Sequence, residues 1–131
     1  MSTPEKAFAN ILNHGDKFMR GTVLSLSSRV IQRTPVGDPS FWIGSAPPGY
    51  AGGTLRNSWH VSFGSPSTEE AREPSESGAG SLSELSKIES WDFGLSYYLT
   101  NNMPYAMVVE EGSSDQAPEG MVRVSLLEAA A

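Results

Sequence analysis

Tyr105, Glu110 and Glu111 are the residues whose types and spacing come nearest to acid–base chemistry, and they share the stretch TNNMPYAMVVEEGSSDQAPEGMVR. A pair of carboxylates can donate and accept protons during a hydrolysis when the two groups flank the reacting bond. Adjacent residues of a helix, however, point about 100° apart, so these two carboxylates cannot face each other. The pattern favours a solvated face, or a pairing with an arginine such as Arg56 or Arg123, over catalysis.

Few other groups are suited to chemistry. The sequence has two histidines and no cysteine, and neither His14 nor His60 has an acidic residue at the spacing of a helical metal site. The glycine-rich GYAGG is followed by no Lys-Ser or Lys-Thr pair, and there is no GxSxG stretch. We therefore expect no cofactor, no catalytic metal and no enzymatic activity. His14 is expected to be solvated on a helix, and His60 to lie on the outward face of a strand.

A long helix is expected over residues 1–34, because apolar residues recur there every three or four positions. Ser2 or Thr3 can cap it, Pro4 suits its first turn, and Pro35 restricts the preceding residue and ends the helix. The apolar positions are Phe8, Ile11, Leu12, Phe18, Met19, Val23, Leu26, Val30 and Ile31.

Residues 35–53 contain too many prolines and glycines for regular structure, yet they carry Trp42 and Tyr50. Such aromatic residues indicate an ordered loop that docks either on its own domain or on a neighbouring protein. Residues 54–64 alternate apolar and polar side chains, which predicts a strand with Trp59 on its apolar face. Residues 65–81, rich in serine, glutamate and glycine, are typical of a flexible loop.

Residues 82–131 are expected to add a short helix, a strand over 95–101 and a second short helix after Pro104. The valines that follow Pro104 leave a strand as the alternative there, and the closing EGMVRVSLLEAA suits either a helix or a strand. The predicted fold is a single α+β domain over residues 1–131. In it, a long N-terminal helix packs on a small antiparallel β-sheet with short additional helices.

The charge is unevenly distributed along the chain. Residues 1–65 hold six basic and three acidic residues, whereas residues 66–131 hold three and twelve, within a net charge of −6. Such a chain is a poor general binder of nucleic acid and suits contact between protein surfaces of opposite sign. No run approaches the ~20 apolar residues of a membrane span, and the N-terminus lacks the pattern of a signal peptide, so we expect a protein made in the cytoplasm.

Two blocks of motifs resemble a known family. RTPVGDPSFW and GYAGGTLRNSW, from about Arg33 to Gly64, and YLTNNMPYAMVVEEGSSDQAPEGMVR, from Tyr98 to Arg123, are similar in content and order to the neck proteins of tailed bacteriophages. These structural proteins are also called head–tail joining or tail-completion proteins. The aromatic segment 35–53 stands where shorter members have a simple turn, and residues 65–90 match no motif of the family.

The resemblance implies a subunit that assembles into a homo-oligomeric ring of six or twelve copies. The ring would lie in the virion neck, between the portal or its adaptor and the tail tube or tail terminator proteins, after synthesis in the host cytoplasm. DNA would pass through its lumen without specific binding, which an acidic lumen would favour.

Two alternatives remain: a tail-terminator or minor tail protein, and, less in keeping with the residues, a small hydrolase that uses Glu110 or Glu111. The expected contacts with other subunits or partners involve Trp42, Tyr50, Trp59, Tyr105, Glu110, Glu111 and Gln116.

Overall fold

The computed structural model describes residues 3–36, 52–104, 106–111 and 120–130. Its longest element is helix α1 (Pro4–Arg33), which runs unbroken for 30 residues, about 45 Å at the usual rise of a helix. Thr3 is the N-cap, and its hydroxyl accepts a hydrogen bond from the amide of Lys6 at 3.2 Å. Thr34 leaves the helical conformation directly before Pro35, as the sequence predicts.

Seven shorter elements follow α1. They are the 3-10 helix η2 (Arg56–Ser58), strand β1 (Trp59–Phe63), helix α2 (Ala79–Glu84), the 3-10 helix η3 (Leu85–Ser90), strand β2 (Tyr97–Asn101), and helices α3 (Ala106–Glu110) and α4 (Val122–Ala130). The chain is therefore α+β, with a long N-terminal helix, a two-stranded antiparallel sheet and short helices, as expected. The segments after Pro104 and at the C-terminus are helices rather than strands.

The sheet pairs β1 with β2 in antiparallel register, from Trp59 opposite Asn101 to Phe63 opposite Tyr97. The predicted strand over 54–64 is too long, because its first part turns. The amide of Asn57 donates to the carbonyl of Gly53, and the amide of Ser58 donates to that of Leu55, both at 3.1 Å. These bonds wind the backbone into η2, so that only the second half of the segment pairs as a strand.

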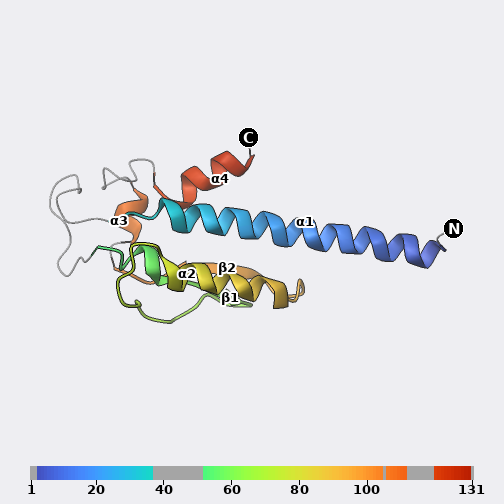
Figure 1. The fold of residues 1–131 in the computed structure, drawn as a ribbon, viewed down its shortest axis with the longest axis horizontal. Coiled ribbons are helices and arrows are strands. Elements are labelled where there is room, and N and C mark those ends of the chain that lie inside the picture. Colours follow the sequence, from blue (N-terminus) through green and yellow to red (C-terminus); the bar gives the residue numbers. More distant parts are fainter. Residues whose placement is uncertain (1–2, 37–51, 105, 112–119, 131) are drawn as a thin grey trace.

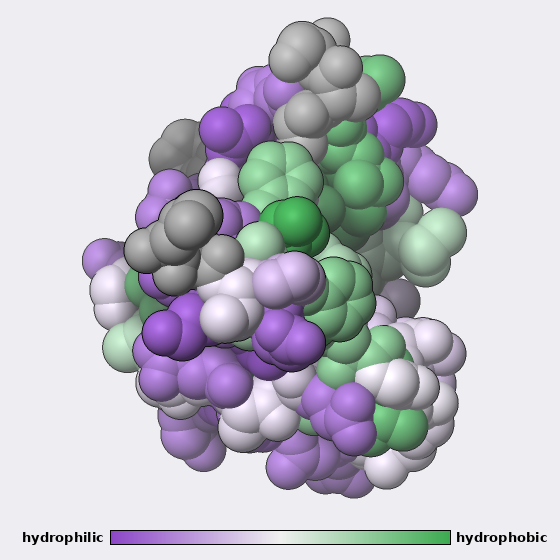
Figure 2. Space-filling view, turned by 90° about the vertical axis from the view of Figure 1, so that its right-hand side faces the viewer, coloured by the Kyte–Doolittle hydropathy of each residue, from purple (hydrophilic) through white to green (hydrophobic). Residues whose placement is uncertain are grey.

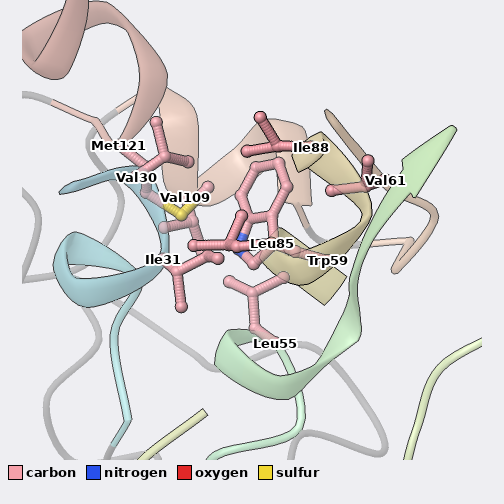
Figure 3. Close-up of a cluster of buried hydrophobic side chains, with 9 residues drawn as sticks. All are labelled: Val30, Ile31, Leu55, Trp59, Val61, Leu85, Ile88, Val109 and Met121. Carbon is pink, nitrogen blue, oxygen red and sulfur yellow. The ribbon is translucent and has the colours of Figure 1, made fainter. Parts of the chain in front are cut away.

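The hydrophobic core joins the C-terminal end of α1 to the sheet and the short helices. Trp59 lies at its centre, as Figure 3 shows, with side chains from α1, η3, α3 and the start of α4 around its ring. Its indole N–H donates to the hydroxyl of Thr34 at 2.9 Å, so the polar edge of this large side chain is satisfied. The core consists of Val30, Ile31, Leu55, Trp59, Val61, Leu85, Ile88, Val109 and Met121.

Only the C-terminal half of α1 belongs to this body. Figure 1 shows the sheet and α2 on one side of that half and α4 on the other, while the N-terminal half extends away from both. Arg20 marks the boundary. Its guanidinium donates to the carbonyls of Ile88 and Trp91, the latter at 2.9 Å, and lies 4.4 Å from the centre of the Phe93 ring. Residues 3–19 are all exposed.

The segment 65–78 forms no helix or strand, but it is not a free loop. Hydrogen bonds fasten it to η2 and β1. The side-chain amide of Asn57 donates to the carbonyl of Glu73 at 2.8 Å. The Arg72 guanidinium donates to the carbonyls of Asn57 at 2.9 Å and Trp59 at 2.7 Å. The expectation of a flexible tip is therefore wrong for this part of the chain. Among the described residues, no helix combines the length and apolar character needed to cross a membrane.

We predict that Thr34→Val lowers the free energy of unfolding by about 1–3 kcal/mol, because it leaves the Trp59 indole N–H unpaired in the core. Urea denaturation followed by tryptophan fluorescence measures this change. Thr22→Val is the matched control, since the Thr22 hydroxyl is exposed and bonds the carbonyl of Phe18 at 2.7 Å. The control is expected to change stability by no more than about 0.5 kcal/mol. Equal losses in the two variants would contradict the role given to Thr34.

Candidate functional site

The residues predicted to make contacts fall into three groups. Trp42, Tyr50, Tyr105 and Gln116 lie outside the described residues. Trp59 is only 4% exposed and lies in the core, so the expectation that it contacts a partner is wrong for this chain. Glu110 is partly buried at the end of α3, and Glu111 is exposed directly after it. The structure therefore separates the two adjacent glutamates into different environments.

Glu110 caps the first turn of α4. Its carboxylate accepts hydrogen bonds from three successive amides: those of Met121 and Val122 at 2.9 Å each and that of Arg123 at 2.7 Å. Burial alone would raise the pKa of this carboxyl, but the three amides and the nearby Arg123 outweigh it and hold the pKa below its ordinary value. These are the amides that a helix leaves unpaired at its N-terminus, so the carboxylate links α3 to α4.

Gly120 makes this approach possible. Its φ is +89°, a backbone conformation that residues with a side chain rarely adopt. A Cβ at this position would lie 2.5 Å from the carbonyl oxygen and 2.9 Å from a carboxylate oxygen of Glu110. The glycine of the GMVR motif and Glu110 therefore form one structural unit.

The structure also brings together three residues that the sequence analysis did not connect. His60, Glu69 and Glu84 place one ligand atom each within 4.8 Å of one another, a group of a kind that can hold a metal ion. His60 is 3% exposed, so the prediction that it lies on an outward face is wrong. The segment 65–78 covers that face of β1, and His60 Nε2 lies 2.9 Å from the carbonyl oxygen of Glu70.

Arg72 lies beside two of these three residues. Its Nη2 lies 3.0 Å from His60 Nδ1 and 3.4 Å from Glu84 Oε1. A guanidinium stays charged, so it supplies the positive charge of this cluster. Burial would raise the pKa of Glu84, but hydrogen bonds from Lys87 and from the Val61 amide, with the charges of Lys87 and Arg72, hold the pKa below its ordinary value.

The contacts of His60 attach the segment 65–78 to β1. Because a carbonyl can only accept, His60 Nε2 carries a hydrogen and donates it to Glu70. In the neutral ring, Nδ1 then accepts from Arg72; in the charged ring, it donates to Glu69 Oε2, 3.1 Å away. Either state fastens the segment 65–78 to β1, so we interpret the cluster as a structural clasp rather than a metal centre.

The most unusual surface of the described chain is the outer half of α1. Phe8, Ile11, Leu12, Phe18 and Met19 are 63%, 68%, 53%, 75% and 45% exposed, and their spacing places them on one side of the helix. We call these five residues the α1 stripe. Figure 2, which looks onto the N-terminal end of α1, shows hydrophobic surface running along the helix and up toward α4. Apolar patches of this kind mark interaction sites.

A second apolar surface lies where α3 meets α4. Met107, Val122, Leu126 and Leu127 are 66%, 36%, 50% and 67% exposed. With Glu110 and Arg123 they line an open hollow of about 580 Å³. We call this the α3–α4 hollow. The carboxylate of Glu110 holds the two helices that form it.

The sequence analysis assigned all apolar positions of α1 to one face that packs on the sheet, and so missed the stripe. At 100° per residue, the apolar residues from Phe8 to Met19 and those from Val23 to Ile31 point in overlapping directions; Phe8 and Leu26, for example, lie at the same angle. The stripe is exposed because the body ends near Arg20, which the apolar spacing does not show. The paired leucines of α4 were likewise read only as part of a helix or strand.

Comparisons with protein-family models, with curated proteins and with solved structures found no match. What the chain does must therefore be argued from its own surfaces.

We predict that Glu110→Gln lowers the free energy of unfolding at neutral pH by about 1–2 kcal/mol, because the neutral amide is a weaker acceptor for the α4 amides. The folded-state pKa of Glu110 lies below the ordinary 4.5, so its contribution is present above pH 4.5 and is lost as the pH falls through the folded value. The difference in the free energy of unfolding between wild type and variant should thus become smaller as the pH falls. Denaturation curves between pH 3 and 7 test this, with the exposed neighbour Glu111→Gln as control. A gap that is independent of pH would contradict the cap.

Proposed function

We propose that this chain is a structural protein of a phage neck, where copies of it form a ring that joins the head to the tail and lets DNA pass. The observation that carries the proposal is the α1 stripe. A helix of 30 residues leaves its outer half exposed, beyond the other described elements of the chain, and that half displays large hydrophobic side chains. Isolated helices of about 15 residues are marginal in water, so the exposed half needs a protein surface to cover it.

The motifs that resemble the neck family support the proposal, because the structure gives one of them, LRNSW, a role in holding α1. Arg56 of LRNSW donates to the carbonyls of Thr34 at 2.8 Å, Gln32 at 2.9 Å and Glu76 at 2.8 Å. Trp59, the last residue of the motif, bonds Thr34 as well. The motif thus fixes the end of the helix that faces the body, as a subunit with a projecting helix requires.

The second motif block serves the α3–α4 hollow. Asn101 donates to the carbonyl of Leu55 at 2.9 Å and accepts from the amide of Met103 at 3.1 Å, which shapes the turn ahead of α3. Glu110 and Gly120 then join α3 to α4. The elements that carry both apolar surfaces are therefore held in place by residues that the resemblance singles out.

The arginines of α1 support passage of DNA without binding. Arg29 and Arg33 both contact the carboxylate of Glu128 on α4, Arg29 at 3.9 Å, and Arg20 is bound to carbonyls of the body. Cations engaged in this way are less available to phosphates. Together with the acidic second half of the chain, they favour a lumen that does not hold DNA.

Glu111, exposed beside the hollow, remains part of the proposed contact surface. Trp42, Tyr50, Tyr105 and Gln116 are proposed contacts on sequence grounds alone. Glu110 changes its role: it supports α4 and acts on assembly through the shape of the hollow. A tail-terminator or minor tail protein stays the alternative, because either also forms a ring that closes a tail.

We predict that the variant Ile11→Gln, Phe18→Gln fails to join heads to tails, because polar side chains interrupt the α1 stripe. The assay mixes heads that lack this protein with free tails and purified protein, and counts joined particles by electron microscopy. The matched control, Asn10→Gln with Asn13→Gln, places the same residue on the opposite side of the same helix. We expect the control to retain full joining activity and the stripe variant to join at least about tenfold fewer particles. A tenfold loss of affinity corresponds to roughly 1.4 kcal/mol of binding free energy.

Two results would overturn the proposal. One is normal joining by heads that never receive the protein. The other is a stable, closed dimer as the only species in finished particles, since a two-fold pair cannot surround DNA as a ring does. A ring located on the tail tube alone, with heads able to mature and retain DNA without it, would favour the tail-terminator alternative.

A further inference from the structure

We propose that the α1 stripe of one copy seats in the α3–α4 hollow of the next copy. This inference rests on the proposed function only in that it requires copies of the chain to assemble. It names the two surfaces that meet and the direction in which they meet. Each copy would then give its projecting helix to one neighbour and receive a helix from the other.

The two surfaces differ in shape in a way that suits each other. The stripe is convex, and its most exposed side chain is the phenyl ring of Phe18, at 75%. The α3–α4 hollow is open, holds about 580 Å³ and is lined by four exposed apolar side chains. Side chains that project from one helix and enter a depression between two others are the usual way in which helices pack.

Gly15 adds a feature that a free helix would not need. It lies one turn from Ile11, Leu12, Phe18 and Met19, in the middle of the stripe, and a Cβ placed on it would meet nothing within 4 Å apart from its chain neighbours and the backbone of its own helix. Glycine inside a helix costs about 1 kcal/mol relative to alanine, so its place there is unfavourable for the isolated subunit. The absence of a side chain lets another backbone approach the stripe closely.

The charges at the rim have opposite signs. Asp16 lies one turn from both Leu12 and Met19, at one edge of the stripe. Arg123 lines the hollow, where its guanidinium also donates to the carbonyl of Glu110 at 3.1 Å. Rim charges of this kind steer association and fix its register.

Among the described residues, none of the five residues of the stripe lines the hollow of its own chain. α4 packs against the C-terminal half of α1, where Arg29 and Arg33 contact Glu128, whereas most of the stripe lies on the half that extends away from the body (Figure 1). A contact of stripe with stripe would leave the hollow uncovered. Among the described residues the other large exposed hydrophobics are Leu24 and Leu95, which lie apart from both surfaces. The pairing of stripe with hollow is thus heterologous, as a closed ring needs.

The sequence contains no cysteine, so single cysteines can report this contact without a background. Chains with Leu12→Cys are mixed with longer, tagged chains that carry Leu127→Cys, under conditions of assembly, and oxidised gently. Because each chain has one cysteine, any product must join two copies. We expect a disulfide-linked product of mixed size, at least about tenfold more abundant than in two controls: Asn13→Cys with Leu127→Cys, and Leu12→Cys with Leu95→Cys.

A second measurement uses the glycines. Gly15→Ala and Gly21→Ala both replace a helical glycine that has open space around it, so each should raise the melting temperature of the monomer. We expect Gly15→Ala alone to weaken assembly, measured as the mass of the particle by light scattering over a concentration series. Equal assembly by the two variants would contradict close approach at Gly15.

The failure of this inference can be told apart from that of the neck role. If Leu12→Cys chains link to one another and not to Leu127→Cys chains, or if no mixed product forms either in finished particles or in concentrated protein, the pairing is wrong while the neck role can stand. If the mixed product forms but particles join without the protein, the neck role is wrong and the self-association stands.

Discussion

The fixation of the last turn of α1 is the constraint on which the rest of this structure depends. Thr34 is fully buried, its hydroxyl donates to the carbonyl of Val30 at 2.7 Å, and the same oxygen accepts from the Trp59 indole. Arg56 donates hydrogen bonds to two carbonyls of the same turn, those of Gln32 and Thr34. A helix end normally leaves such carbonyls to water, and here the body satisfies them. The direction of α1 is thereby set at one end, so its free half projects at a defined angle.

The sequence predicts the parts of the fold that depend on local chemistry. A cap at Thr3, a stop at Pro35 and apolar spacing define α1. Alternation of apolar and polar residues over 54–64 and the aromatic residues of 95–101 place the strands near where the structure has them. The prediction is wrong where side chains reach backbone groups far along the chain. The Asn57 side chain, for example, donates to the carbonyl of Glu73 and accepts from the amide of Gly80, which holds η2 against the segment after β1 and against α2. Spacing alone does not show such bonds.

The candidate surfaces were even less visible in the sequence. Glu110 was predicted to be a contact residue, and in the structure it caps α4. His60 and Arg72, twelve positions apart, come together only because the segment 65–78 folds back over β1. The α1 stripe was hidden among the residues assigned to the core. Which apolar residues of a long helix remain uncovered depends on where the body ends, and that is a property of the whole fold.

A rigid projection with an apolar stripe also determines what kind of assembly is possible. Because α1 is anchored within its last four turns by Arg20, the core and Thr34, a force on its outer half is transmitted directly to the sheet and to η3. The α3–α4 hollow is held to the same body through Glu110 and through the contacts of Glu128 with α1. The α1 stripe and the α3–α4 hollow are therefore fixed relative to each other. If copies assemble through these two surfaces as we propose, each added copy turns through the same angle, and such repetition either closes into a ring or continues as a helix.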